Sequence, residues 1–189
     1  MDLKLLWFCA KTKPYLTRIW KNQFELATLK EIVEQDALNG KIVAVSDFDC
    51  EEIVHTYENN GATHHRYNTK TLDNEQLLRR SLIIGQSIDE YLGDHDYDKN
   101  NNVVGYAIHI KNLHIFDEPK KLGMAHYTTL KSANKIQKAP QNMCIVRSYY
   151  PKNYFEKYVL ISVHPEWLCL ILNGLKDVEL RRKVLKEML

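Results

Sequence analysis

The sequence predicts a single α+β domain with a barrel-like layout, in which strands alternate with a helical middle. Three observations support this prediction. Asn39-Gly40 forms a turn that leads into an apolar strand from Lys41 to about Val54. Two capping boxes then indicate short helices. A strand, a short helix and a second strand follow within residues 158–183.

The helical middle is marked by residues that begin helices. Asp73 and Gln76 match a capping box, in which the two side chains bond reciprocally to the backbone of the first turn. We expect this helix to run to about Ile84. Ser87 and Glu90 match a second capping box, so we expect another short helix to begin there.

The polar loop after these helices resembles a calcium-binding loop in part. Asp94, Asp96 and Asp98 match the first three ligand positions of an EF-hand. Lys99 replaces the required glycine, and Gly105 stands where the bidentate glutamate belongs. We therefore expect a solvated acidic loop, and we predict neither a metal site nor a cofactor.

The C-terminal part predicts a strand, a helix and a tight turn. Tyr158 to Val163 is an apolar run typical of a buried strand. His164-Pro165 then begins a helix, because proline is well accommodated in the first helical turn. Asn173-Gly174 ends that helix, since either residue readily adopts the left-handed backbone of a C-cap.

The residues after this turn predict a polar site. In a strand, Val178 and Leu180 would point to one face and Glu179 and Arg181 to the other. Lys176 would converge with the two polar residues. A lysine there could hold a phosphate or, if partly buried, lose its proton and act as a base or nucleophile. Alternatively, Glu179 and Arg181 form a structural ion pair.

Composition sets bounds on the class of protein. A chain of 189 residues that is 44% apolar can form one sizeable core, and no linker-like segment divides residues 1–189. The N-terminus has no charged leader and no long apolar segment, so we expect a cytoplasmic protein that does not contact a membrane. The four cysteines are scattered without metal-binding spacing, and we expect free buried thiols.

Positive charge is concentrated between residues 111 and 152, although the whole chain has a net charge of only +2. This stretch contains eight basic residues against two acidic ones, with tyrosines interleaved. Such a stretch is typical either of a solvated lysine-rich face or of a surface that binds phosphates and stacks bases. The basic residues are Lys111, Lys120, Lys121, Lys131, Lys135, Lys138, Arg147 and Lys152.

The C-terminal segment resembles the ASCH family of the PUA-like superfamily. The family signature is GxKxxExR directly after a strand and a helix, and Gly174, Lys176, Glu179 and Arg181 fill its four positions. The sequence ISVHPEWLCLILNG is similar to the opening strand and helix of the family. The resemblance therefore implies a PUA-like β-barrel with a few short helices packed around it.

The order of the motifs differs from the family. Gly105 to Leu122 and Lys138 to Val146 resemble later strands of the family, yet they precede the signature here. This order indicates a circular permutation, which nearby termini would permit. The alternative is a second domain cut short at Leu189. A permuted chain could be a monomer, or it could be a dimer that exchanges its C-terminal unit.

The resemblance implies an RNA- or nucleotide-binding protein, since PUA-like domains hold RNA in the cleft between the barrel and the first helix. Lys176 and Arg181 would contact phosphate, and Trp167 would stack on a base. The residues expected to line or flank this cleft are His164, Trp167, Lys176, Glu179, Arg181, Lys11 and Lys13.

The resemblance also permits two other functions. Some ASCH proteins are hydrolases, and one group removes the acetyl group from acetylated cytidine with a lysine that matches Lys176. A threonine stands in that group where this chain has Glu179. Other members of the ASCH family have been proposed to cleave RNA. In either kind of hydrolase, Lys176 would activate the attacking water and Glu179 would shuttle the proton. The third possibility is a regulatory or oligomerising protein that has kept the barrel and lost the ligand.

Overall fold

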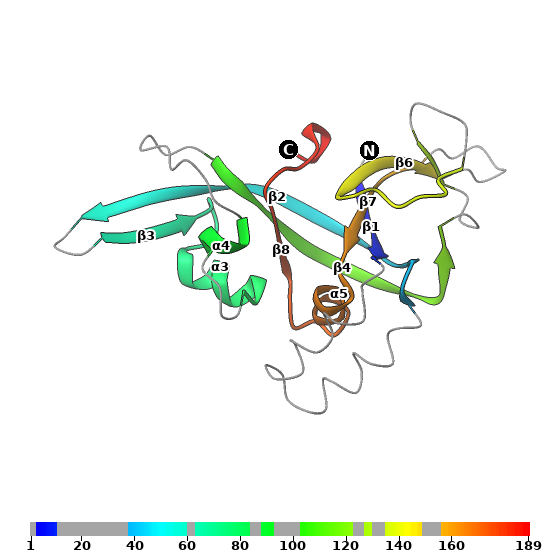
Figure 1. The fold of residues 1–189 in the computed structure, drawn as a ribbon, viewed down its shortest axis with the longest axis horizontal. Helices are drawn as coiled ribbons and strands as arrows, with labels where there is room; N and C mark the ends of the chain where they lie inside the picture. Colours follow the sequence, from blue (N-terminus) through cyan, green and yellow to red (C-terminus); the bar gives the residue numbers. More distant parts are fainter. Residues whose placement is uncertain are drawn as a thin grey trace. The chain divides into compact units, whose positions relative to one another are not determined.

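The computed structural model of the protein describes residues 3–10, 38–59, 63–83, 88–92, 103–122, 127–129, 135–148 and 156–189. The predicted acidic loop, the capping box that begins at Ser87, and the site residues Lys11 and Lys13 lie outside these ranges. Within them the protein has an α+β fold, as predicted, with a mixed sheet and short helices (Figure 1).

The described part of the chain contains eight strands and three α-helices. The strands are β1 (Lys4–Cys9), β2 (Lys41–Asn59), β3 (Thr63–Asn68), β4 (Val103–Lys121), β5 (Tyr127–Thr129), β6 (Met143–Ser148), β7 (Lys157–Val163) and β8 (Val178–Arg181). The helices are α3 (Asn74–Ser81), α4 (Ile88–Leu92) and α5 (Pro165–Leu172), and a 3₁₀ turn, η2, follows at Lys186–Met188.

The strands form one mixed sheet in the order β5-β6-β7-β1-β2-β4-β8, and β3 also pairs with β2. Strands β1 and β7 run parallel. The pairs β1–β2, β2–β3, β4–β8, β5–β6 and β6–β7 are antiparallel. This order has two ends, so the described strands form an open sheet, and the predicted barrel closure is not seen among them.

The chain divides into two compact units. Unit 1 comprises residues 1–47 and 112–174, and unit 2 comprises residues 48–111 and 175–189. The long strands β2 and β4 each have one part in each unit. The sequence-based assignment of all 189 residues to one ASCH domain stays a prediction.

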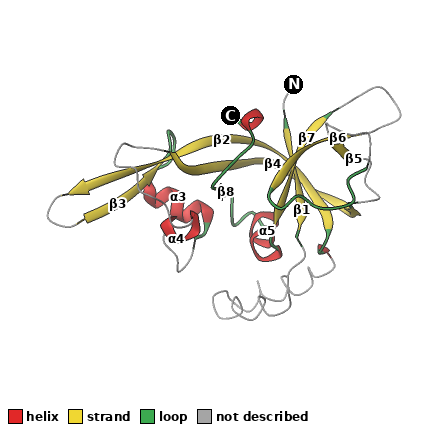
Figure 2. Ribbon diagram, turned by 45° about the horizontal axis from the view of Figure 1, so that its top comes forward, coloured by secondary structure: helices red, strands yellow, loops and turns green. Residues whose placement is uncertain are grey.

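The core of unit 1 forms where the central strands pair. Strand β1 lies between β2 and β7 (Figure 2). Its residues Leu6 and Phe8 pack with Ile42, Val146 and Leu160. These positions are apolar in each strand, so their burial removes apolar surface from water. The core therefore joins strands that are more than a hundred residues apart in the chain.

The indole of Trp7 is buried on the opposite side of β1 from Leu6 and Phe8, as strand alternation requires. Its Nε1 donates to Ser46 Oγ at 2.9 Å. The hydrogen bond satisfies the one polar atom of a large buried side chain.

The core of unit 2 is covered by α3 and α4. Leu77 of α3 and Leu92 of α4 pack with Ile53, Ala107 and Leu180 from three strands. Gly105 of β4 leaves room for this packing, since a Cβ there would lie 3.1 Å from the Leu92 side chain and 3.0 Å from the carbonyl of Arg181.

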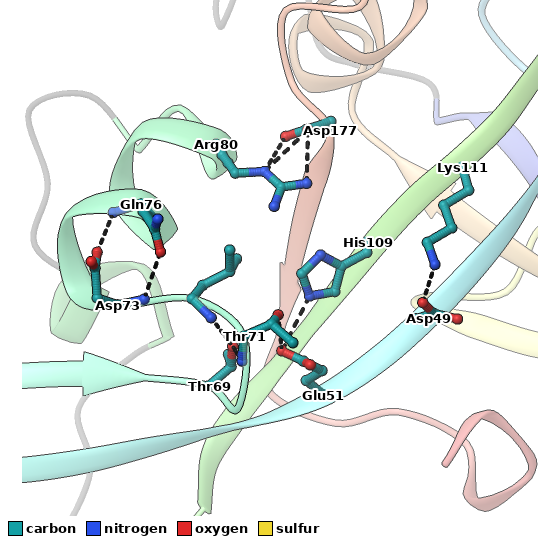
Figure 3. A network of polar contacts seen from close by, with 11 residues as sticks. Asp49, Glu51, Thr69, Thr71, Asp73, Gln76, Arg80, His109, Lys111 and Asp177 are labelled. Atoms are coloured by element: carbon teal, nitrogen blue, oxygen red, sulfur yellow. Dashed lines mark hydrogen bonds and ion pairs between the residues drawn. The ribbon is translucent and has the colours of Figure 1, made fainter.

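Helix α3 begins with the capping box that the sequence predicts. Asp73 Oδ1 accepts from the Gln76 backbone N–H at 2.8 Å, and Gln76 Oε1 accepts from the Asp73 N–H at 3.1 Å (Figure 3). The helix ends at Ser81, earlier than expected, because Leu82 takes the left-handed conformation with φ 52°. Its last carbonyls therefore need partners from elsewhere in the fold.

The predicted strand, helix and strand of the C-terminal segment are all present. Helix α5 has Pro165 in its first turn and ends at Leu172, followed by the C-cap residue Asn173. Gly174 has φ 69°, the left-handed value expected of it. Its N–H donates to the carbonyl of Ile171 at 3.0 Å, which satisfies one of the last helical carbonyls.

Candidate functional site

Strand β8 positions the polar signature residues of unit 2. It pairs antiparallel with β4, so that Leu180 lies opposite Ala107 and Glu179 opposite Ile108. Val178 and Leu180 point into the unit 2 core, as predicted. Glu179 points to the other face of β8, and its side chain is nevertheless 98% buried.

Lys176, Glu179 and Arg181 converge, as their spacing predicts, and we call them the signature cluster. Lys176 Nζ lies 3.3 Å from Glu179 Oε2, and Arg181 Nη2 lies 2.9 Å from Glu179 Oε1. One carboxylate therefore bridges two cationic side chains. Glu179 Oε2 makes no hydrogen bond within the described residues, although it is close to the ammonium group.

Lys176 is the most buried member of the cluster. Its side chain has no exposed surface, whereas that of Arg181 is 18% exposed. Lys176 Nζ donates to the carbonyl oxygen of Ser81 at 2.5 Å. Ser81 is the last residue of α3, so the ammonium group lies at the negative end of the helix dipole. Lys176 thus satisfies a buried helix carbonyl and links β8 to α3.

Burial lowers the pKa of Lys176. The carboxylate of Glu179 opposes this change and raises the pKa, while the positive charge of Arg181 lowers it further. The same cluster affects Tyr91 on α4, because burial and then the charge of Glu179 raise the pKa of its hydroxyl. Burial is the main cause in both cases, so it favours a neutral Tyr91 and weakens the proton affinity of Lys176.

An ion pair next to the cluster holds the start of β8 against α3. Arg80 Nε and Nη2 donate to the carboxylate of Asp177 at 2.8 to 3.1 Å (Figure 3). The two parallel bonds give a bidentate geometry that restricts both side chains. Lys176 and Asp177 are consecutive, so two polar links from neighbouring residues reach the last turn of α3.

A second polar cluster in unit 2 was not predicted. Glu51 Oε2 accepts from Thr71 Oγ1 at 2.9 Å and lies 3.3 Å from His109 Nε2 (Figure 3). Burial raises the pKa of Glu51, but hydrogen bonds from Thr69, Thr71 and His109 outweigh it, so the pKa is lowered overall. These residues come from β2, β4 and the loop before α3, and no local sequence pattern connects them.

The thiol of Cys50, the residue next to Glu51 in the sequence, is not activated as a nucleophile. Burial, reinforced by the charges of Glu51 and Glu52, raises the pKa of Cys50 to about 11. A thiol with that pKa carries little thiolate, which is the nucleophilic form. None of the four cysteines forms a disulfide, as predicted. The prediction that they are buried is confirmed for Cys9 and Cys169 and is wrong for Cys50 and Cys144, which are half-buried.

The remaining predicted site residues belong to unit 1 or fall outside the described ranges. His164 is the exposed N-cap residue of α5, and its side chain makes no capping hydrogen bond. Trp167 is half-buried in the first turn of the same helix. Their participation in a ligand site with the signature cluster stays a prediction.

Within the described ranges, no group of three or more His, Cys, Asp or Glu side chains is arranged to hold a metal ion. Among the same residues, none of the helices is both long enough and apolar enough to cross a membrane.

Comparison with models of protein families, with curated proteins and with solved structures gave no match. The resemblance to the ASCH signature therefore rests on the four residues Gly174, Lys176, Glu179 and Arg181 and on the elements that precede them.

Proposed function

We propose that this protein binds RNA or a nucleotide, and that Arg181 contacts a phosphate of the ligand. The observation that carries the proposal is the geometry of Arg181, which is held by the buried carboxylate of Glu179 while part of its side chain reaches the surface. An arginine fixed in this way loses little conformational entropy when it binds an anion, and its planar fork matches the geometry of a phosphate.

The charges of the signature cluster support an anionic ligand. The signature cluster places two cationic side chains, Lys176 and Arg181, around the single carboxylate of Glu179. A phosphate that binds at Arg181 would add negative charge close to Lys176 and would favour its protonated form.

Lys176 then acts as a positioning residue. Because its side chain is wholly buried and donates to Ser81, it orients Glu179 instead of contacting the ligand directly. The PUA-like barrel with permuted motif order is part of the same proposal. It is supported by the signature and by the strand, helix, glycine turn and strand that contain it.

The proposal can be tested by measuring which ligands the purified protein retains. We would incubate it with a mixed pool of cellular RNA and nucleotides and identify the retained ligand by mass spectrometry. Arg181→Ala should strongly weaken retention, and Arg181→Lys should weaken it less, since lysine keeps the charge but lacks the fork. Arg182→Ala is the matched control, because Arg182 is the adjacent exposed arginine. Equal retention by wild type and Arg181→Ala would refute the proposal.

The second candidate function is hydrolysis, either of acetylated cytidine or of RNA, with Lys176 and Glu179 as catalytic residues. The lowered pKa of Lys176 favours it, since a neutral amine could accept a proton from water. The amine would have to leave Ser81 and become accessible. Acetate release from acetylated cytidine, or shortening of RNA, would have to be lost in Lys176→Ala while Arg182→Ala stays active. Ligand retention without any product would exclude this function.

A further inference from the structure

The antiparallel strands of unit 1 place four polar residues in one line across the sheet. Lys135 pairs with Thr128 of β5, Thr128 pairs with Arg147 of β6, and Arg147 pairs with Lys157 of β7. Residues directly opposite each other in antiparallel strands point to the same face, with Cβ atoms about 5 Å apart. Lys135, Thr128, Arg147 and Lys157 therefore form a row on one face, about 15 Å long, which we call the cation row.

The cation row has three positive charges and no negative one. Lys135 and Lys157 are exposed, Arg147 is half-buried, and Thr128 forms a buried floor between Lys135 and Arg147. The acidic residue closest in sequence to Lys157 is Glu156, and its carboxylate accepts a hydrogen bond from Tyr158. Within the described residues, no carboxylate is paired with a member of the row.

Arg147 adds an observation that points to a ligand. Its Nε is buried, and it makes no hydrogen bond to any described residue. A buried donor without an acceptor costs about 1 to 3 kcal/mol, and more when the group is charged. An anion that accepted from Arg147 would remove this cost. Exposed lysines are solvated by water and do not by themselves indicate a ligand, whereas the buried Nε of Arg147 lacks an acceptor that a bound anion would supply.

We propose that the cation row binds the phosphate backbone of a single-stranded nucleic acid. The row is narrow and linear, and its three charges are spread along its length across the sheet, which suits a chain of phosphates. A membrane surface would instead favour a broad basic patch next to exposed apolar side chains. The row contains no aromatic side chain, so it contacts phosphates and does not distinguish bases.

This inference rests on the proposed function only for the class of ligand, and it does not depend on the signature cluster. The two sites lie in different units, so each can be changed by substitutions that leave the other site intact. A protein that binds nucleic acid through the cation row alone would retain binding in Arg181→Ala. A protein that uses the signature cluster alone would retain binding when the row is neutralised.

The experiment measures the affinity for a labelled oligouridylate of about ten nucleotides at several salt concentrations. Each neutralised phosphate on a single strand contributes about −0.7 to the slope of log K against log salt concentration. The row should therefore contribute about −2 to the wild-type slope. The double variant Lys135→Ala with Lys157→Ala, which removes the two exposed lysines, should reduce the magnitude of this slope by about 1.4. Arg147→Lys should leave the slope unchanged, because the charge remains.

The matched control is Lys121→Ala with Lys138→Ala, which removes the same charge from exposed residues of unit 1 outside the row. The control should keep a slope close to that of the wild type. Equal losses in the two double variants would overturn the inference, because binding would then follow net charge alone. It would also be overturned if the protein bound vesicles of anionic lipid but not the oligouridylate or an oligothymidylate of equal length.

Discussion

The structural role of the signature residues depends on Lys176, a buried lysine whose ammonium group is held by two different partners. Lys176 has no exposed surface, yet it has a helix carbonyl on one side and a carboxylate on the other. Taking an ammonium group out of water costs several kcal/mol, and Ser81 and Glu179 offset that cost. Glu179 is the central member, because both cations depend on it.

Removing Glu179 should therefore destabilise the protein more than removing Lys176. Glu179→Ala leaves the buried Lys176 and the largely buried Arg181 without their carboxylate and should lower the free energy of unfolding by about 3 to 5 kcal/mol. Lys176→Met removes the bond to Ser81 and the ion pair with Glu179, but Glu179 keeps Arg181, so the cost should be smaller, about 1 to 3 kcal/mol. Urea denaturation of both variants measures the difference. A larger loss in Lys176→Met would contradict this account of the cluster.

Glu51 should make the stability of the protein depend on pH. Its pKa is lowered below the ordinary value of 4.5, so the folded state binds its proton less readily than the unfolded state. The stabilising contribution is complete above pH 4.5 and is lost as the pH falls through the lowered pKa. Wild type should thus be more stable than Glu51→Gln at pH 7, and the difference should shrink towards pH 3.

The control for this pH dependence is Glu52→Gln, which changes the adjacent exposed carboxylate. Thermal unfolding from pH 7 to pH 3 should show wild-type behaviour in Glu52→Gln. If Glu51→Gln remained less stable than wild type by the same amount at every pH, its loss would reflect packing and not the charge of the carboxylate.

At the level of elements, the turn between α5 and β8 depends on the backbone of one residue. Gly174 has φ 69°, and a Cβ at this position would meet no atom within 4 Å. Gly174→Ala should therefore cost about 1 to 2 kcal/mol from backbone strain alone. Gly174→Asn should cost less, since asparagine tolerates this conformation. Chemical denaturation of the two variants tests the order, and a neutral Gly174→Ala would show that the turn can adopt another conformation.

Local patterns located most elements but did not give their lengths. The capping box at Asp73 and the proline at 165 are short-range signals, and the helices begin where they indicate. Strand β2 continues beyond its predicted end near Val54, to Asn59. Strand β4 runs to Lys121, and its second half contains Pro119 and several charged residues, which have low strand propensity. Its extended conformation depends on tertiary context, which a local pattern does not reveal.

For the whole molecule, the two cores and the position of each strand in the sheet determine where the structure is most stable. In unit 1, β1 and β7 have strands on both sides and contain residues with no exposed surface, such as Trp7 and Leu160. Strand β5 lies at the end of the sheet and has three residues. Local opening is least frequent where buried contacts are densest.

Hydrogen exchange measured by mass spectrometry should follow this order. Amides of β1 and β7 should exchange slowest in unit 1, with protection that approaches the global free energy of unfolding, whereas β5 should exchange first. Slower exchange in β5 than in β1 would mean that another element covers the end of the sheet.

Four features could be predicted from the amino-acid sequence: the α+β class, the capping box of α3, the glycine turn after α5 and the convergence of Lys176, Glu179 and Arg181. Each of these follows from spacing within a few residues, where helix and strand periodicity decide which side chains meet. Three further features could be seen only in the folded chain: Lys176 is buried against Ser81, Glu51 lies close to His109, and Lys135, Arg147 and Lys157 form one row. Those contacts join separate strands and helices, and strand register and burial arise only when the whole chain packs.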